Sequence, residues 1–417
     1  MSRPLVVLGV TGGIAAYKSA DLIRRLKEQD LDVQVITTKS ALKFVGETTF
    51  AALSGHPVIS DIWDNAHEVE HVNVAKKADA IVVAPATADF LAHLAYGFAN
   101  DVLLATLLVA KCPIILAPAM HTEMWENSAT KENVATLRKR GFLVLDPAVG
   151  KLTGEDSGVG RLPDTTEIAQ VVKQVINRKS ANLGKDLVGL NILISAGGTR
   201  EAIDPIRFIG NRASGKQGVA LALSALSRGA KVTLVGANLS VNVPAGVEFI
   251  SANTAKEMQE QMQLRAGSAD VVIMNAAVAD YFIANPDENK IKKNDEKLTI
   301  ELDKTTDILS VLADSKPIKQ YLVGFAAETT TDDDDLIASA KSKLDSKKAD
   351  LIVGNKVSKS VGISSDENEV IMVTANEAVL LPKADKLLLA DAMWDFIVKQ
   401  LAKVGREEKS PVEPDLA

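Results

Sequence analysis

The 417-residue sequence contains very little cysteine and few aromatic residues. Cys112 is its one cysteine, so the chain cannot form an internal disulfide, and we expect a reducing compartment, the cytoplasm. Phe, Trp and Tyr together make up 4% of the residues, so aliphatic side chains must fill the hydrophobic cores. The length allows two domains or three.

An excess of positive charge and a long hydrophobic run are also missing. The net charge is −7, which gives no general attraction to nucleic acids or anionic membranes. No apolar stretch is long enough to span a membrane, and the short apolar run near the N-terminus predicts a buried first strand rather than a signal peptide. We therefore expect partners that are small molecules, with any phosphate group bound at a local site.

The first half alternates short runs rich in Val, Ile and Leu with stretches of helical periodicity. Such runs between helices are typical of a parallel sheet that is covered on both faces. Strands are predicted at residues 4–10, 32–36, 80–84, 113–117 and 142–145, and the first helix at 14–28.

The same alternation restarts after a polar segment around Gly184. Here strands are predicted at 190–195, 231–236, 270–275, 320–324 and 350–353, and helices at 214–228 and 383–401. The sequence therefore predicts an α/β protein with two doubly wound parallel-sheet (Rossmann-like) domains. They are placed at 1–180 and 188–404, with a linker at 181–187 and a disordered tail at 405–417.

Two turns in the first half are suited to a phosphate. Thr11-Gly12-Gly13-Ile14 follows the first strand, where glycines let the backbone approach an anion and the next helix offers free N–H groups. Thr37-Thr38-Lys39-Ser40 follows the second strand and adds hydroxyl donors at the same edge. Neither turn is a GxGxxG motif or a P-loop, and a purely geometric role fits these residues equally well.

Four motifs of the first half, at 12–18, 84–89, 97–101 and 118–125, occur in an order that resembles the homo-oligomeric flavin-containing cysteine decarboxylase family. The resemblance covers essentially the whole first half and implies a flavoprotein fold with FMN bound between subunits. Helix capping is the alternative role for Thr87 and Asn100. The FMN-site residues that the resemblance implies are Gly12, Gly13, Ile14, Thr38, Pro85, Thr87, Asn100 and Met120.

The same resemblance makes His71, at the start of a predicted helix, the catalytic base. Histidine suits this role because it exchanges protons near neutral pH, although an exposed histidine at a helix start is the structural alternative. Loss of the cysteine carboxylate requires an electron sink. Flavin provides one by oxidising the thiol-bearing carbon and later returning the hydride.

The sequence departs from that family at two places. His121 stands where many members have an asparagine, and either residue can orient a substrate carboxylate, although a structural role for His121 fits the sequence equally well. The flap-like segment 150–161 lacks the cysteine that usually returns a proton, so Thr153, Glu155 and Asp156 are candidates by position. Cys112 precedes a strand elsewhere and is predicted to be a buried small hydrophobe.

Motifs of the second half, at 195–201, 204–207, 211–216, 276–281, 290–293 and 324–329, resemble the bacterial phosphopantothenate–cysteine ligase family. The resemblance spans roughly residues 188–400, implies a ligase fold and makes CTP the nucleotide. Residues 305–308 differ from the commoner Asn-Pro-Asp-Ile. The implied nucleotide contacts are Ser214, Gly215, Lys216, Ala276, Ala277, Asp280, Lys290, Thr305, Thr306, Asp307, Ile308, Phe325, Lys343 and Lys347.

The residues themselves fit this chemistry. Ser214-Gly215-Lys216 opens a predicted helix, and Lys290, Lys292 and Lys293 can neutralise a triphosphate, although a lysine cluster by itself is usually a solvated face. Asp280 can accept from the base or sugar, or help to hold Mg²⁺. The resemblance gives Asn211 and Arg207 the task of holding an acyl-cytidylate. The acidic run 332–335 is predicted to start a helix.

Together the resemblances imply two consecutive steps of coenzyme A biosynthesis. The substrates would be 4′-phosphopantothenate, cysteine and CTP, with FMN and Mg²⁺ as cofactors. Trimeric contacts in one half and dimeric contacts in the other imply a homo-oligomer and allow a dodecamer. One alternative is an active ligase with an impaired decarboxylase half. Another is a flavin-binding regulatory subunit, which the short tail and the ligase-like half disfavour.

Overall fold

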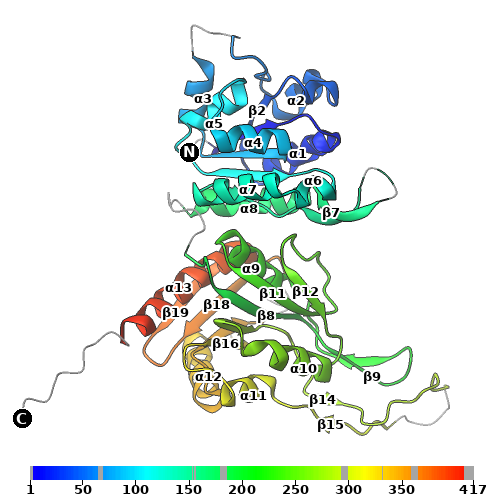
Figure 1. Ribbon diagram of the computed structural model, residues 1–417. Coiled ribbons are helices and arrows are strands. Elements are labelled where there is room, and N and C mark those ends of the chain that lie inside the picture. Colours follow the sequence, from blue (N-terminus) through cyan, green and yellow to red (C-terminus); the bar gives the residue numbers. More distant parts are fainter. Residues whose placement is uncertain are drawn as a thin grey trace, which may run out of the picture. The chain divides into compact units, whose positions relative to one another are not determined.

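The computed structural model describes residues 3–63, 69–152, 154, 156–178, 186–292, 299–330, 332–357 and 365–407. The chain divides into two compact units, Met1–Lys185 with Pro244–Gly246, and Asp186–Val243 with Val247–Ala417. Each unit contains one large sheet flanked by helices (Figure 1) and buries its own hydrophobic core.

The sheet of the first unit has five parallel strands in the order β2-β1-β3-β4-β5. Its sequence is apolar because the strands are covered on both faces, and all seven residues of β3 are buried. The strand order reverses between β1 and β3, which is where open α/β sheets bind ligands. The strands are β1 (Leu5–Val10), β2 (Asp32–Thr37), β3 (Ala80–Ala86), β4 (Ile114–Pro118) and β5 (Leu143–Val144).

Helices and one hairpin complete the first unit. The predicted helix at 14–28 is divided, because a 3-10 helix, η1 (Ile14–Lys18), precedes α1 (Ser19–Glu28). The flap-like segment forms an antiparallel hairpin of β6 (Ala148–Lys151) and β7 (Ser157–Arg161). The remaining helices are η2 (Ala41–Lys43), α2 (Glu47–Ser54), α3 (Glu70–Lys77), α4 (Ala88–Tyr96), α5 (Val102–Val109), α6 (Thr122–Glu126), α7 (Ser128–Lys139) and α8 (Thr165–Asn177).

The sheet of the second unit has eight strands in the order β12-β11-β8-β13-β16-β17-β18-β19. The first six are parallel, and β18 and β19 add an antiparallel edge. The order reverses between β8 and β13. The strands are β8 (Asn191–Gly197), β11 (Lys231–Ala237), β12 (Glu248–Ser251), β13 (Val271–Met274), β16 (Tyr321–Glu328), β17 (Leu351–Lys356), β18 (Glu367–Val373) and β19 (Ala378–Asp385).

Five helices and two short ribbons surround this sheet. The indole N–H of Trp394, on the last helix, donates to the carbonyl of Leu221 at 3.0 Å and ties two helices together in the core. The ribbons pair β9 (Arg200–Ala202) with β10 (Phe208–Gly210), and β14 (Tyr281–Phe282) with β15 (Asp303–Lys304). The helices are α9 (Lys216–Ser227), α10 (Ala255–Ala266), α11 (Ile308–Asp314), α12 (Asp333–Lys347) and α13 (Lys386–Glu407).

The predicted fold class is confirmed, with local differences. Residues 383–385, predicted to begin the last helix, belong to β19, and α13 runs past Gly405 to Glu407. Asp332 caps α12 by accepting from two backbone N–H groups, which confirms the predicted helix start. The predicted linker residues 181–185 and the tail residues 408–417 lie outside the described residues. Among the helices that are described, none has the length and apolarity to cross a membrane.

Candidate active sites

A cavity of about 670 Å³ lies in the first unit, at the switch point between β1 and β3. Its walls come from the turns after β1, β3 and β4 and from the β6–β7 hairpin. The lining includes glycine backbone, hydroxyl groups and apolar side chains, so one end is polar and much of the rest is apolar. The lining residues are Gly12, Gly13, Ile14, Ala15, Tyr17, Lys18, Ser40, Pro85, Thr87, Ala88, Asp89, Ala119, Met120, His121, Met124, Lys151, Leu152, Gly160, Arg161 and Leu162.

The turn after β1 is fixed by hydrogen bonds to the turn after β3. The buried Thr11 hydroxyl donates to the carbonyl of Pro85 at 2.7 Å and accepts from the N–H of Thr87 at 3.2 Å. Thr87 also caps α4, because its hydroxyl accepts from the N–H of Phe90 at 3.4 Å. The alternative prediction, that Thr87 caps a helix, is therefore confirmed. Thr87 also lines the cavity.

Gly12 and Ser40 pack closely at the polar end of the cavity. A Cβ atom at position 12 would lie 2.3 Å from Ser40 Oγ, so only glycine allows this approach. Ser40 lines the cavity, and its hydroxyl is 3.0 Å from that of Thr38. Thr38 is buried behind it and is not a lining residue. Of the predicted hydroxyl donors in this turn, Ser40 is thus the one that faces the cavity.

His121 lies at the other side of this cavity, at the N-terminus of α6. The N–H of the preceding residue, Met120, donates to the carbonyl of Gly160 at 2.9 Å and joins this segment to the hairpin. The half-exposed His121 ring has Nδ1 3.9 Å from Asp156 Oδ2. Thr153 and Glu155, the other candidates in this segment, lie outside the described residues.

Three basic residues line the first cavity and were missed by the sequence analysis as a group: Lys18, Lys151 and Arg161. Burial lowers the pKa of Lys18, and the nearby positive charge of Arg161 lowers it further. The signal available in the sequence was the lysine that ends the motif at 12–18. The positions of Lys151 and Arg161 depend on the hairpin and could not be inferred from spacing.

Besides Thr38, two predicted site residues of the first unit do not line the cavity. His71 is half-buried in the first turn of α3, a helix that packs against α5. Asn100 is exposed in the segment between α4 and α5, and the cap of α5 is Asp101 rather than Asn100. Capping is therefore wrong as the alternative for Asn100. Within this unit the two residues remain apart from Gly12, His121 and the other lining residues.

Cys112 has the structural character that the sequence predicted. It is partly buried and packs against the core cluster of the first unit. Burial raises the pKa of its thiol to about 11.

A second cavity, of about 370 Å³, lies in the second unit at the switch point between β8 and β13. Amide and ammonium groups dominate its polar lining. The residues are Gly197, Asn211, Arg212, Ala213, Ser214, Gly215, Lys216, Gln217, Asn275, Ala276, Ala277, Phe325, Ala327, Asn355, Asn368 and Lys386. Seven of them were predicted as site residues from the sequence, namely Asn211, Ser214, Gly215, Lys216, Ala276, Ala277 and Phe325.

Two local features place the predicted residues on this cavity. Gly215 is the N-cap of α9 with φ +76°, a conformation that favours glycine, and this turn places Gly215, Lys216 and Gln217 in the cavity lining. The Asn211 amide donates to the carbonyl of Val278 at 2.9 Å, which holds it beside Ala276 and Ala277.

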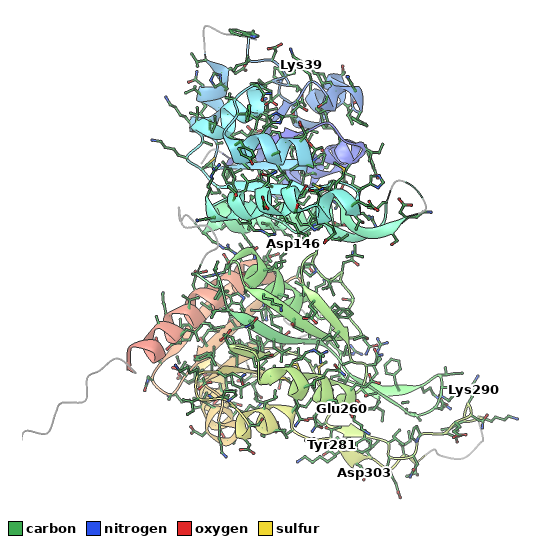
Figure 2. The ribbon with its side chains drawn as sticks, viewed as in Figure 1. Lys39, Asp146, Glu260, Tyr281, Lys290 and Asp303 are labelled. Atoms are coloured by element: carbon green, nitrogen blue, oxygen red, sulfur yellow. The ribbon has the colours of Figure 1, made fainter. Side chains whose placement is uncertain are left out.

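Figure 2 shows Lys290 on an extension of the second unit that reaches away from the sheet. Arg207 contacts the same segment, since its Nη2 donates to the carbonyl of Ile291 at 2.8 Å. Asp204 accepts from Arg207 Nε at 2.9 Å and Nη2 at 2.7 Å, and it also accepts from the N–H of Ile291 at 3.2 Å. These bonds hold the pKa of the buried Asp204 carboxyl well below its usual range. Arg207 therefore anchors the segment that carries the exposed Lys290.

The other predicted nucleotide contacts lie outside the lining of this cavity. Thr305 is bonded to residues 279 and 280. Its hydroxyl donates to the carbonyl of Ala279 at 2.7 Å, and its N–H donates to the backbone carbonyl of the exposed Asp280. Asp307 caps α11 and pairs with Lys347, and Lys343 pairs with Glu328 at 2.7 Å. Thr306 is exposed and Ile308 is buried.

A preformed metal site would require several His, Cys, Asp or Glu side chains close together. Within the described ranges, no group of three or more His, Cys, Asp or Glu side chains is arranged to hold a metal ion.

Two family models match the chain, one to each unit. The Flavoprotein model matches residues 1–177, and the DNA/pantothenate metabolism flavoprotein C-terminal domain matches residues 187–401. The folds and cavities thus define a two-domain protein that joins a flavoprotein domain to this second domain.

Curated relatives match over nearly the whole chain. The coenzyme A biosynthesis bifunctional protein CoaBC of Mycobacterium tuberculosis (strain ATCC 25618 / H37Rv) is 47% identical over 405 residues, which is 95% of this chain and 97% of the relative. The protein of the same description from Vibrio vulnificus (strain CMCP6) is 40% identical over 390 residues, 92% of this chain and 95% of the relative. The chain belongs to the family of coenzyme A biosynthesis bifunctional proteins.

Solved structures resemble the two halves separately. The C-terminal domain of a coenzyme A biosynthesis bifunctional protein CoaBC is 37% identical with a TM-score of 0.45, covering 52% of this chain and 99% of that chain. The FMN binding protein AtHal3 is 26% identical with a TM-score of 0.38, covering 43% of this chain and 99% of that chain.

Proposed function

We propose that this chain catalyses two consecutive steps of coenzyme A biosynthesis. The second unit joins cysteine to 4′-phosphopantothenate with CTP, and the first unit decarboxylates the resulting 4′-phosphopantothenoylcysteine to 4′-phosphopantetheine with FMN. The proposal rests on the match to bifunctional relatives through 95% of the chain, with a cavity at the switch point of each sheet.

In the ligase step, a carboxylate must be activated before an amine can attack it. The carboxylate of phosphopantothenate attacks the α-phosphorus of CTP, forming an acyl-cytidylate and releasing pyrophosphate. The amine of cysteine then attacks the acyl carbon, the amide bond forms, CMP leaves, and the surplus amine proton passes to solvent. The groups available for the phosphates are Lys216 and the N–H groups that open α9.

Three other residues are assigned to this step. Asn211 has its amide at the cavity and would hold the acyl-cytidylate by hydrogen bonds. Lys290, on the extension anchored by Arg207, would approach the phosphates when that extension meets the substrate. Asp280 is exposed and would share Mg²⁺ with phosphate oxygens, since Mg²⁺ commonly takes only one or two protein carboxylates together with substrate phosphates.

The first cavity fits FMN in chemistry. The close packing of Gly12 against Ser40 leaves backbone N–H and hydroxyl groups for a phosphate, and Ile14, Met120 and Pro85 provide apolar surface for a flat ring. FMN, when bound, supplies the electron sink that departure of the carboxylate requires. Lys18, Lys151 and Arg161 would attract the anionic substrate to the same cavity.

We assign His71 and Asn100 to the same decarboxylase site through a neighbouring copy of the chain. Neither residue lines the cavity of its own unit, and Asn100 is exposed. Large apolar side chains near them are exposed as well, with Tyr96 76% and Phe98 51% accessible. A homo-oligomer in which the His71 face of one copy closes the cavity of the next would complete the site, with His71 as base.

The return proton is assigned to the pair formed by His121 and Asp156. Asp156 lies on the hairpin that covers the cavity, and its carboxylate faces the ring of His121, which lines the cavity. An imidazole at this position can act as a general acid toward the product carbon, and the adjacent carboxylate can orient the ring. This pair would take over the task of the cysteine that the segment 150–161 lacks.

The test is a single assay on the purified full chain. With phosphopantothenate, cysteine, CTP and Mg²⁺, the expected products are phosphopantetheine, carbon dioxide, CMP and pyrophosphate. The preparation should be yellow or bind added FMN. Absence of both the flavin and CTP binding would overturn the proposal.

A second candidate function is a ligase whose decarboxylase half is impaired. The observation that favours it is the absence of cysteine from segment 150–161. In the same assay this alternative predicts accumulation of phosphopantothenoylcysteine without carbon dioxide, while FMN still binds.

A further inference from the structure

Lys386 is a buried lysine that lines the cavity of the second unit. It is the first residue of α13, directly after the edge strand β19, and only 6% of its surface is accessible. Lys216, which begins α9, lines the same cavity. Two lysines from distant parts of the sequence therefore line one small space.

Both lysines are held by one short segment of the chain. Lys386 Nζ donates to the carbonyl of Ser365 at 2.6 Å, and its backbone N–H donates to the carbonyl of Asp366 at 2.9 Å. Lys216 Nζ pairs with the carboxylate of the exposed Asp366 at 2.6 Å. These contacts fix the two ammonium groups at the cavity and keep them close to each other.

The arrangement has an electrostatic cost. Burial disfavours the charged form of Lys386, and the positive charge of Lys216 adds to this, so the pKa of Lys386 falls to about 8. Asp366 and Asp385 offset only part of the effect. Buried cations are retained in proteins where an anion meets them, and an anion between Lys216 and Lys386 would favour both charges at once.

The remaining lining of the cavity is suited to the same anion. The first turn of α9 lines the cavity with Gly215, Lys216 and Gln217, and a helix start has backbone N–H groups without partners inside the helix. Asn275 and Asn355 contribute amides, and the Asn355 Oδ1 atom is buried without a hydrogen-bond partner in this structure. An amide that can rotate offers its N–H₂ group to an oxyanion, so hydrogen-bond donors surround the two lysines.

We propose that Lys386 and Lys216 together bind a phosphate group of a ligase substrate, which makes Lys386 a further substrate-binding residue of the second unit. The inference rests on the proposed ligase function. Two sources of phosphate are available in that reaction, the triphosphate of CTP and the 4′-phosphate of phosphopantothenate, and they are distinguished by binding measurements.

The experiment compares Lys386→Met with Lys383→Met in the full-length chain. Lys383 lies on β19, is half-exposed, pairs with Glu367 at 2.8 Å and does not line the cavity, so it is a matched control. Calorimetric titrations measure the affinity for CTP, cytidine, pyrophosphate, phosphopantothenate and pantothenate. Thermal unfolding verifies that each variant is folded.

The expected result is an affinity about tenfold or more lower in Lys386→Met, the loss typical of one charge-assisted hydrogen bond. If Lys386 binds the triphosphate, the affinities for CTP and pyrophosphate fall while that for cytidine does not. If it binds the 4′-phosphate, the affinity for phosphopantothenate falls while that for pantothenate does not. Lys383→Met should match the parent chain in both cases, and Lys386→Arg should recover part of the lost affinity.

The proposal is overturned if the affinity of Lys386→Met for every phosphate ligand is within twofold of that of the parent chain. It is also overturned if the affinities for ligands with and without phosphate fall equally. If Lys386→Met does not fold, Lys386→Gln replaces it, since glutamine can keep the bond to Ser365. A parent chain that binds neither CTP nor phosphopantothenate would instead refute the ligase function itself.

Discussion

Asp156 Oδ2 lies 3.9 Å from Nδ1 of His121, so a carboxylate on the hairpin faces an imidazole on the cavity wall. At this distance the carboxylate and the imidazole can act as a pair beside the cavity.

Asp156→Asn should slow decarboxylation by about tenfold to a hundredfold, because the carboxylate that faces the His121 ring is lost from the proposed proton-donating pair. The ligase activity of the same preparation serves as an internal control and should not change. The measurement is the rate of carbon dioxide release from supplied phosphopantothenoylcysteine. Equal rates in the variant and the parent would exclude this pair as the proton source.

Thr11→Val should lower both the stability of the first unit and its affinity for FMN. Valine has nearly the shape of threonine but leaves the carbonyl of Pro85 and the N–H of Thr87 without the buried Thr11 hydroxyl. The expected loss of stability is about 1–3 kcal/mol, the usual cost of unsatisfied buried polar groups. Release of flavin fluorescence during urea unfolding measures it.

Thr49→Val is the control for that variant, since Thr49 is exposed on α2 and does not line the cavity. It should unfold at the urea concentration of the parent. If Thr11→Val unfolds at the same urea concentration as the control, water replaces the lost hydroxyl at the turn.

Cys112 should react slowly with thiol reagents in the native protein. Burial raises the pKa of the thiol from 9.0 to about 11, so little reactive thiolate exists at pH 8. The native chain should therefore react much more slowly with a disulfide reagent than the urea-unfolded chain. Since the raised pKa favours the protonated form on folding, this contribution to stability is complete below about pH 9 and disappears as the pH rises through 11.

Cys112→Ser should leave carbon dioxide release within about twofold of the parent, because the thiol packs against the core rather than lining the cavity. If a folded Cys112→Ser protein lost most of its decarboxylase rate, the Cys112 thiol would again be a candidate proton donor.

Asp204→Asn should lower ligase activity by about tenfold or more. The substitution removes the charge that holds Arg207 and weakens the bond to Ile291, so the segment with Lys290 loses its anchor. Decarboxylation of supplied phosphopantothenoylcysteine is the control and should persist. Because the folded pKa of Asp204 is lowered, its contribution to stability is present above the ordinary aspartate pKa, about 3.9, and is lost as the pH falls toward the folded value.

The sequence predicted the central strands of both sheets because these strands are continuous apolar runs between helices. It did not predict the antiparallel pair β18 and β19. The burial of β19 alternates along the strand, and it contains Pro382, which an edge strand tolerates because one side makes no ladder hydrogen bonds. Local periodicity gave no sign that these residues extend the sheet past β17.

The candidate sites were predictable where a motif follows a central strand, as for Gly12, Thr87 and Ala276. Lys386 was not, because its place on the cavity arises from the packing of α13 against α9 across the second unit. No spacing in the sequence relates Lys386 to Lys216. The separation of His71 from the cavity was equally invisible, since the sequence does not say which residues of a parallel sheet's loops face one another.

Each cavity is lined wholly by residues of its own unit. The intermediate is therefore bound by a different set of residues in each of the two reactions. An inactive-ligase chain mixed with an inactive-decarboxylase chain should then still make phosphopantetheine, and excess unlabelled phosphopantothenoylcysteine should dilute a radioactive label on its way to the final product.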